Sequence, residues 1–203
     1  FYQLCFSLNR KEAAMKNTGK ARRLTKGEIK IAKSMFGDAI DYDKVRIANK
    51  RVNLLQPENG GLCTMNTINI AGEGYCDDYS LAEPGLTAFF VHEMTHIWQY
   101  QSNALSLATK FISESLRYRG KYFEKAYKYD LSDKDKFTSF GIEQQACMME
   151  DWYILKNHPE FDEYYGRCKN DGLSPQDRMK KYKALTEKHF KPHAPEKRPV
   201  LNK

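Results

Sequence analysis

The sequence predicts an α+β fold that is mainly helical, with a small N-terminal sheet that precedes one long buried helix. The strand signals are short β-branched segments with alternating apolar residues, and they are confined to residues 41–70. Farther along, apolar residues recur at helical spacing, and residues 86–118 contain neither proline nor glycine. At 203 residues the chain is long enough to bury a core, so we expect a single domain.

The N-terminal elements follow from caps and turns. Thr25-Lys26-Gly27-Glu28 is a capping box that begins a helix, and Gly37 ends this helix. Residues 41–54 alternate loosely and predict short strands. The segment Pro57-Glu58-Asn59-Gly60-Gly61 predicts a turn, and residues 65–70 predict a further strand.

Helices are predicted for most of the remaining chain. Pro84-Gly85 marks the start of the long helix, and residues 104–130 also carry an apolar face at helical spacing. Residues 140–153 predict a second buried helix. Ser174, followed by proline, caps a final helix.

The charge distribution predicts three regions: a basic N-terminal arm (1–23), a folded domain (24–190) and a basic, Pro-rich tail (191–203). The net charge is +7, and basic arms favour anionic surfaces. The chain contains no zinc-finger, RRM or Walker pattern, so we do not expect nucleic-acid binding to be its main function. No apolar run approaches membrane length, so we expect no membrane span.

The most informative motif is His92-Glu93-Met94-Thr95-His96, which lies inside the long predicted helix. Positions i and i+4 of a helix share a face, so His92 and His96 can bind one Zn²⁺ ion together. Glu93 then lies beside a metal-bound water and can act as a general base. The alternative is a core helix with two hydrogen-bonded histidines and no metal.

A catalytic zinc site needs a third protein ligand, and Glu143 is our candidate. It lies beside the apolar stripe of the second buried helix, and the small residues Ala146 and Cys147 one turn later would let two helices approach closely. The alternative is that Glu143 is a solvated acid in the first turn of its helix, where the helix dipole favours it.

These two motifs resemble the gluzincin metallopeptidases, which hold zinc with two histidines and one glutamate. The words around them, Phe90-Val91-His92-Glu93-Met94-Thr95-His96-Ile97-Trp98-Gln99-Tyr100-Gln101 and Ile142-Glu143-Gln144-Gln145-Ala146, resemble a narrower bacterial group. That group contains Vgr-related zincin-like proteins found near Rhs and type VI secretion genes. The resemblance covers about residues 24–156 and implies a zincin-like fold.

The resemblance also implies roles for individual residues. His92, His96 and Glu143 would bind zinc, and Glu93 would act as base and proton shuttle. Gluzincins use a tyrosine or histidine to stabilise the oxyanion, and Tyr129 is our candidate, with Tyr127 as a second one. Gluzincins also bind substrate along an edge strand, which we place at residues 65–70.

Cys147 departs from the gluzincin pattern. Many gluzincins have an acidic residue four positions after the ligand glutamate, where it orients a zinc histidine, and Cys147 occupies that position here. Another group must then supply this partner: Glu150, Asp151, Asp77, Asp78 or a backbone carbonyl. A Cys147 thiolate that approaches the metal itself is a further alternative.

The sequence therefore predicts a zinc-dependent hydrolase of peptide or amide bonds. Its substrate would be a peptide, a protein or a peptidoglycan stem peptide, and a secretion-apparatus component or an immunity protein would be its partner. We expect it in the bacterial cytoplasm, or secreted without a recognisable signal peptide. The alternative function is a secretion-linked adaptor with a structural or degenerate zinc site.

Overall fold

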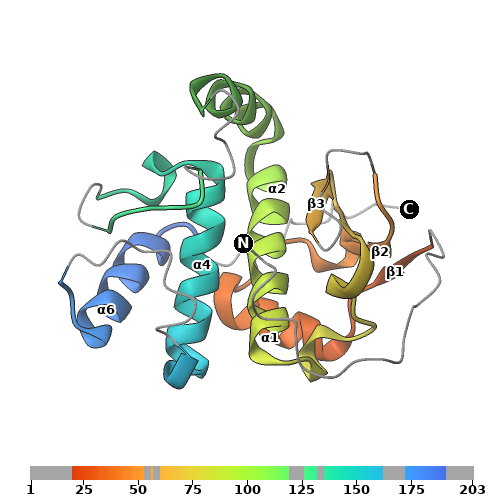
Figure 1. Cartoon of the computed structure of the whole chain (residues 1–203), viewed down its shortest axis with the longest axis horizontal. Coiled ribbons are helices and arrows are strands. Elements are labelled where there is room, and N and C mark those ends of the chain that lie inside the picture. The colour runs from red at the N-terminus through yellow and green to blue at the C-terminus, as the bar shows by residue number, and fades with distance from the viewer. Residues whose placement is uncertain are drawn as a thin grey trace, which may run out of the picture.

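The computed structural model shows a mixed α+β fold, with a small sheet on one side of a long helix and further helices on the other (Figure 1). It describes residues 20–52, 56, 60–118, 126–131, 135–161 and 172–190, and it describes no side chains between residues 104 and 118. Within these ranges the fold has four α-helices and one four-stranded sheet. This confirms the α+β class.

The sheet has the strand order β1-β2-β4-β3. The central pair, β2 and β4, is parallel, and β1 and β3 each pair antiparallel with one of them. The strands are β1 (Ala21–Arg23), β2 (Arg46–Asn49), β3 (Gly61–Thr64) and β4 (Thr67–Ile70). Strand β3 pairs only with β4, so it is an edge strand of the sheet. It also contacts α2.

The strand predicted at residues 65–70 is present as β4, but its predicted place at the edge of the sheet was wrong, because β4 lies between β2 and β3. The edge is formed instead by Gly61–Thr64, which begins within the predicted turn. A tight reversal at Met65, which has a positive φ of 56°, joins the two strands and produces this pairing.

Helix α1 (Lys26–Phe36) begins at the predicted capping box and ends at Gly37, which has a φ of 57°. Its buried Glu28 binds Arg22 of β1 at 2.7 Å, so charges on the first strand and the first helix are paired. The sheet therefore includes the last three residues of the segment predicted as a basic arm. Residues 1–19 of that arm and the predicted tail (191–203) lie outside the described residues.

Helix α2 (Pro84–Tyr118) runs through the centre of the molecule between the sheet and helix α4 (Ile142–Asn157), as Figure 1 shows. It contains a kink at Asn103, where the backbone is not helical. Helix α6 (Pro175–Thr186), capped by Ser174, packs on the far side of α4. The helix predicted over 104–130 extends too far, because α2 ends at Tyr118 and residues 126–131 are not helical.

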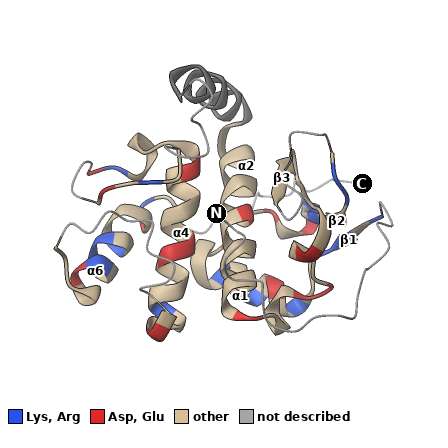
Figure 2. Ribbon diagram, in the orientation of Figure 1, with Lys and Arg blue, Asp and Glu red and all other residues tan. Residues whose placement is uncertain are grey.

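Charged residues divide between the helices. In Figure 2 basic residues gather on α6, whereas acidic residues mark α4 and the middle of α2. The buried carboxylates of these two helices include Glu93 on α2 and Glu143 and Glu150 on α4. None of the helices described is both long and apolar enough to cross a membrane.

Candidate metal centre

Helix α2 brings His92, Glu93 and His96 into the interior of the molecule. The helix is rich in apolar residues that enter the core on several sides, so the polar residues of the motif are carried inward with them. His92 and Glu93 are 3% and 4% exposed, and the side chain of His96 is 14% exposed. Buried groups of this kind need partners, because burying an unpaired polar or charged group is costly.

Glu143 of α4 meets the two histidines. Its Oε2 atom lies 3.4 Å from His92 Nε2 and 3.4 Å from His96 Nε2, and the two Nε2 atoms are 3.3 Å apart. In a tetrahedral zinc site with bonds of about 2.0–2.1 Å, neighbouring ligand atoms are about 3.3 Å apart. The triangle formed by these three atoms therefore has the size that zinc requires.

The partner of His92 fixes which of its nitrogens faces the cluster. His92 Nδ1 lies 3.1 Å from Glu150 Oε2, and Glu150 is 1% exposed. A carboxylate accepts the Nδ1 proton, so Nε2 presents its lone pair toward Glu143 and His96. Of the groups that the sequence offered for this role, the structure places Glu150 at the imidazole.

Cys147 lies close to this pair. It is fully buried on α4, and its sulfur, a nitrogen of His92 and a carboxylate oxygen of Glu150 all lie within 4.8 Å of one another. The residues described thus include a second group of metal-binding type, which shares His92 with the first. Glu150 is hydrogen bonded to the imidazole, whereas Cys147 packs beside both residues.

Gln99 performs the corresponding role for His96. Its Oε1 atom lies 2.8 Å from His96 Nδ1, and its Nε2 atom donates to Ile142 and Gln145 of α4. The sequence analysis did not identify Gln99 as a functional residue. The sequence feature that could have identified Gln99 is its position three residues after His96, because residues three apart lie on one face of a helix.

The electrostatics of the cluster reflect its buried charges. Burial alone would raise the pKa of Glu143, but the neighbouring His96 and His92 outweigh burial and lower it. Burial alone would lower the pKa of His96, but the effect of the Glu143 carboxylate is larger, so the pKa of His96 is raised. Burial raises the pKa of Glu93, against the opposing effect of both histidines. Glu143 is therefore held as an anion that faces two imidazoles.

Strand β3 closes the cluster on the side of Glu93. A Cβ atom on Gly61 would collide with the Glu93 carboxylate, so only glycine lets the strand approach this closely. Cys63 Sγ lies 3.3 Å from Glu93 Oε2 and 3.3 Å from the Glu93 carbonyl oxygen. Burial raises the pKa of the Cys63 thiol, which keeps it protonated and able to donate. The sequence analysis assigned neither residue to the site.

The two tyrosine candidates lie in different surroundings. The Tyr129 hydroxyl donates to Asp151 at 2.7 Å and lies 2.8 Å from the Tyr182 hydroxyl, so its hydrogen bonds run to α4 and α6. Tyr127 stacks on His92, with ring centroids 6.2 Å apart and an angle of 16° between the ring planes. Of the two, Tyr127 is the one that the structure places against a residue of the cluster.

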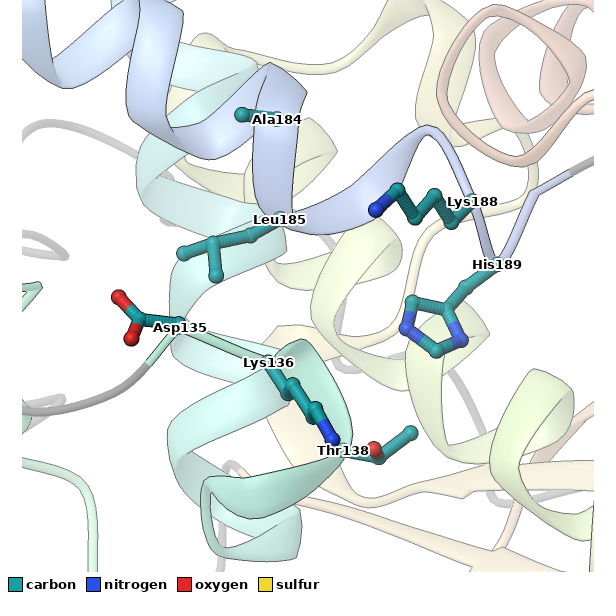
Figure 3. A pocket seen from close by; sticks show the side chains of 7 residues that line it. All are labelled: Asp135, Lys136, Thr138, Ala184, Leu185, Lys188 and His189. Atoms are coloured by element: carbon teal, nitrogen blue, oxygen red, sulfur yellow. The ribbon is translucent and has the colours of Figure 1, made fainter.

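A surface pocket of about 240 Å³ lies elsewhere, between the C-terminal end of α6 and the residues before α4 (Figure 3). Its lining includes Lys136, Leu185 and His189. None of the residues that line it belongs to the cluster of His92, His96 and Glu143. The pocket therefore does not mark the candidate metal centre.

Comparison with known proteins identifies one relative by sequence and one by structure. The type VI secretion system spike protein VgrG2b of Pseudomonas aeruginosa is 31% identical over 144 residues, which are 70% of this chain. The solved structure of the effector domain of P. aeruginosa VgrG2b aligns with a TM-score of 0.57 and 29% identity, over 73% of this chain and 84% of that domain. The chain is similar in sequence and in fold to the VgrG2b effector domain.

The similarity to VgrG2b has a limited extent. The match spans 14% of the length of the spike protein, and no protein-family model matches the chain. The Vgr-related part of the resemblance that the sequence predicts is confirmed.

Proposed function

We propose that this chain is a type VI secretion effector with a zincin-like zinc site that hydrolyses peptide or amide bonds. The observation that carries the proposal is the triangle of His92 Nε2, His96 Nε2 and Glu143 Oε2, with sides of 3.3–3.4 Å. With both histidines neutral, all three atoms are acceptors and repel one another, and a divalent cation removes that repulsion. The similarity to the VgrG2b effector domain supports the link to type VI secretion.

The residues of the chain fit the requirements of a hydrolytic zinc site. A bound Zn²⁺ ion would lower the pKa of a water and polarise the scissile carbonyl. Glu93, next to His92 on α2, would take the proton of that water and deliver it to the leaving amine. Burial raises the pKa of Glu93 in the metal-free chain, and a base whose pKa lies closer to neutrality both accepts and returns a proton readily.

The edge strand and the stacked tyrosine supply substrate contacts in this proposal. An extended peptide adds to the outer edge of β3, where main-chain groups of Gly61–Thr64 bind it beside Glu93. Tyr127 donates to the oxyanion, since its ring stacks on His92. Tyr129 supports the position of α4 through Asp151 rather than acting on the substrate. Peptide, protein and peptidoglycan stem peptide all offer the amide bond that such a site cleaves.

The proposal is tested with Glu93→Gln, which keeps the size of the side chain and removes the base. We expect the variant to bind one zinc per chain and to hydrolyse a peptide library and peptidoglycan stem peptides about 10²–10⁴-fold more slowly, which is the contribution of general-base catalysis. Glu83→Gln is the matched control, because Glu83 is exposed just before α2. Full activity of Glu93→Gln would exclude Glu93 as the base.

The same measurements distinguish the second function. A chain that binds zinc at His92, His96 and Glu143 but cleaves none of these substrates would be a secretion-linked adaptor with a structural metal. A Tyr127→Phe variant with lower kcat and unchanged zinc content supports the oxyanion role, and Tyr129→Phe is its control. A loss of turnover in Tyr129→Phe alone would return that role to Tyr129.

A further inference from the structure

A chain of buried amide side chains connects His96 to the start of α4. Gln99 Oε1 lies 2.8 Å from His96 Nδ1, and Gln99 Nε2 donates to the Ile142 carbonyl at 2.9 Å and to Gln145 Oε1 at 3.0 Å. Gln145 Nε2 then donates to the Phe140 carbonyl at 2.8 Å. Gln99 and Gln145 are 8% and 3% exposed, so the chain is buried between α2 and α4.

The amide groups of Gln99 and Gln145 can satisfy all of these hydrogen bonds in only one orientation. The carbonyl oxygens of Phe140 and Ile142 can only accept, so both glutamine nitrogens must face α4. The oxygen of Gln99 is then fixed opposite His96 Nδ1. Because an amide oxygen also only accepts, it favours a proton on Nδ1 and leaves the His96 Nε2 lone pair for a cation between Glu143 and His92. Without a cation, the Glu143 carboxylate, 3.4 Å from Nε2, competes for a proton on that nitrogen.

The hydrogen-bonded amides of Gln99 and Gln145 also help to position Glu143, the proposed third ligand. Ile142, whose carbonyl accepts from Gln99, directly precedes Glu143. The hydrogen bond that orients His96 therefore also holds the first turn of α4 against α2. Since Gln99 is neutral, it achieves this without a further buried charge beside the carboxylates of Glu93, Glu143 and Glu150.

We propose that Gln99 and Gln145 are positioning residues that hold His96 in the Nδ1-protonated tautomer, with Nε2 directed at the metal. This inference rests on the proposed metal site. His92 has a different arrangement, in which the Glu150 carboxylate accepts the Nδ1 proton. The site thus orients one histidine with an anion and the other with a neutral amide chain that ends on the backbone of α4.

The tautomer is measured directly by nitrogen-15 NMR of the metal-free chain, at a pH at which the His96 imidazole is neutral. In Gln99→Met, which keeps the length of the side chain but not its acceptor, the share of the Nδ1-protonated form should fall below that of the wild-type chain, because only Glu143 then accepts from His96. Gln99→Glu keeps an acceptor at Nδ1 and should retain the wild-type share. Gln101→Met is the matched control, because Gln101 lies on the same helix and binds Asn66 instead.

Zinc affinity, measured by competition with a chromophoric chelator, provides the second readout. Gln99→Met should weaken zinc binding about 10–100-fold, as loss of the hydrogen-bond partner of a metal ligand does. Gln145→Met should weaken zinc binding about fivefold, because Gln99 keeps its hydrogen bond to the Ile142 carbonyl and loses only the neutral hydrogen bond to Gln145. Circular dichroism confirms that each variant is folded.

Two outcomes would overturn the inference: a folded Gln99→Met variant with wild-type tautomer balance and zinc affinity, or a zinc-loaded wild-type chain in which His96 binds zinc through Nδ1. A wild-type chain that binds no zinc but shows the Nδ1-protonated tautomer would contradict the proposed function and leave the positioning role of Gln99 supported. The two proposals therefore fail in distinguishable ways.

Discussion

At the scale of single residues, the identity of the His92 partner answers the question that Cys147 raised. The gluzincin pattern has an acidic residue four positions after the ligand glutamate, where this chain has Cys147, and the structure places an acidic partner seven positions after Glu143, at Glu150. Positions 147 and 150 are three residues apart, so they share a face of α4. The longer glutamate side chain reaches His92 from the next turn, which the sequence could offer only as one of several alternatives.

Exchange of Glu150 for glutamine should therefore weaken zinc binding more than any change at Cys147. Glu150→Gln removes the anion that fixes and polarises His92, and we expect an affinity loss of about 10–100-fold. Cys147→Ala is the control, since it leaves the hydrogen bond at Nδ1 in place. Chelator competition measures both. An equal or greater loss in Cys147→Ala would show that the thiol itself binds the metal.

At the scale of elements, strand β3 shows why local patterns failed beside the site. Gly60-Gly61 is a turn signal in isolation, because glycine is unfavourable in strands. The strand nevertheless needs Gly61, because its backbone approaches Glu93 of α2. Strand propensity describes a residue and its neighbours, whereas this glycine is required by a helix about thirty positions later in the chain.

A methyl group at Gly61 should impair catalysis without removing the metal. Gly61→Ala would force the Glu93 carboxylate to move, and a shift of about 1 Å in a catalytic group costs about a hundredfold in rate. Zinc content should stay at one per chain, because the atoms nearest to a methyl group at Gly61 belong to Glu93 rather than to His92, His96 or Glu143. Steady-state kinetics together with metal analysis test this expectation.

Leu62→Ala is the matched control for Gly61→Ala. Successive side chains of a strand point to opposite faces, so Leu62 faces away from Glu93. It should retain most of the wild-type turnover. Wild-type kinetics for Gly61→Ala would show that the close approach of β3 does not constrain the base.

The helices that carry the site were more predictable than the strands. The capping box at Thr25, the start at Pro84 and the cap at Ser174 are local signals, and all three correspond to helix starts in the structure. The order of the strands depends on long-range pairing, which alternation within residues 65–70 does not reveal. For the same reason, periodicity could not show that the helix predicted over 104–130 ends at Tyr118.

At the scale of the whole molecule, the candidate centre lies where the layers of the fold meet. Helix α2 supplies His92 and His96, helix α4 supplies Glu143, and strand β3 of the sheet closes on Glu93 (Figure 1). The spacing within α2 directly predicted that His92 and His96 lie together. Glu143 could be nominated only from its place beside an apolar stripe, because the distance between two helices is a tertiary property.

Zinc should therefore stabilise the folded chain by joining α2 to α4. A ligand at a thousand times its dissociation constant stabilises the native state by about 4 kcal/mol. For a chain of 150–250 residues, each kcal/mol shifts Tm by about 2–4 °C, so zinc should raise Tm by about 8–16 °C. Differential scanning calorimetry with zinc and with excess chelator measures this shift. His92→Ala should show none of it. A wild-type Tm that does not respond to chelator would mean that no metal joins the two helices, and that neutral or protonated histidines alone hold Glu143 in place.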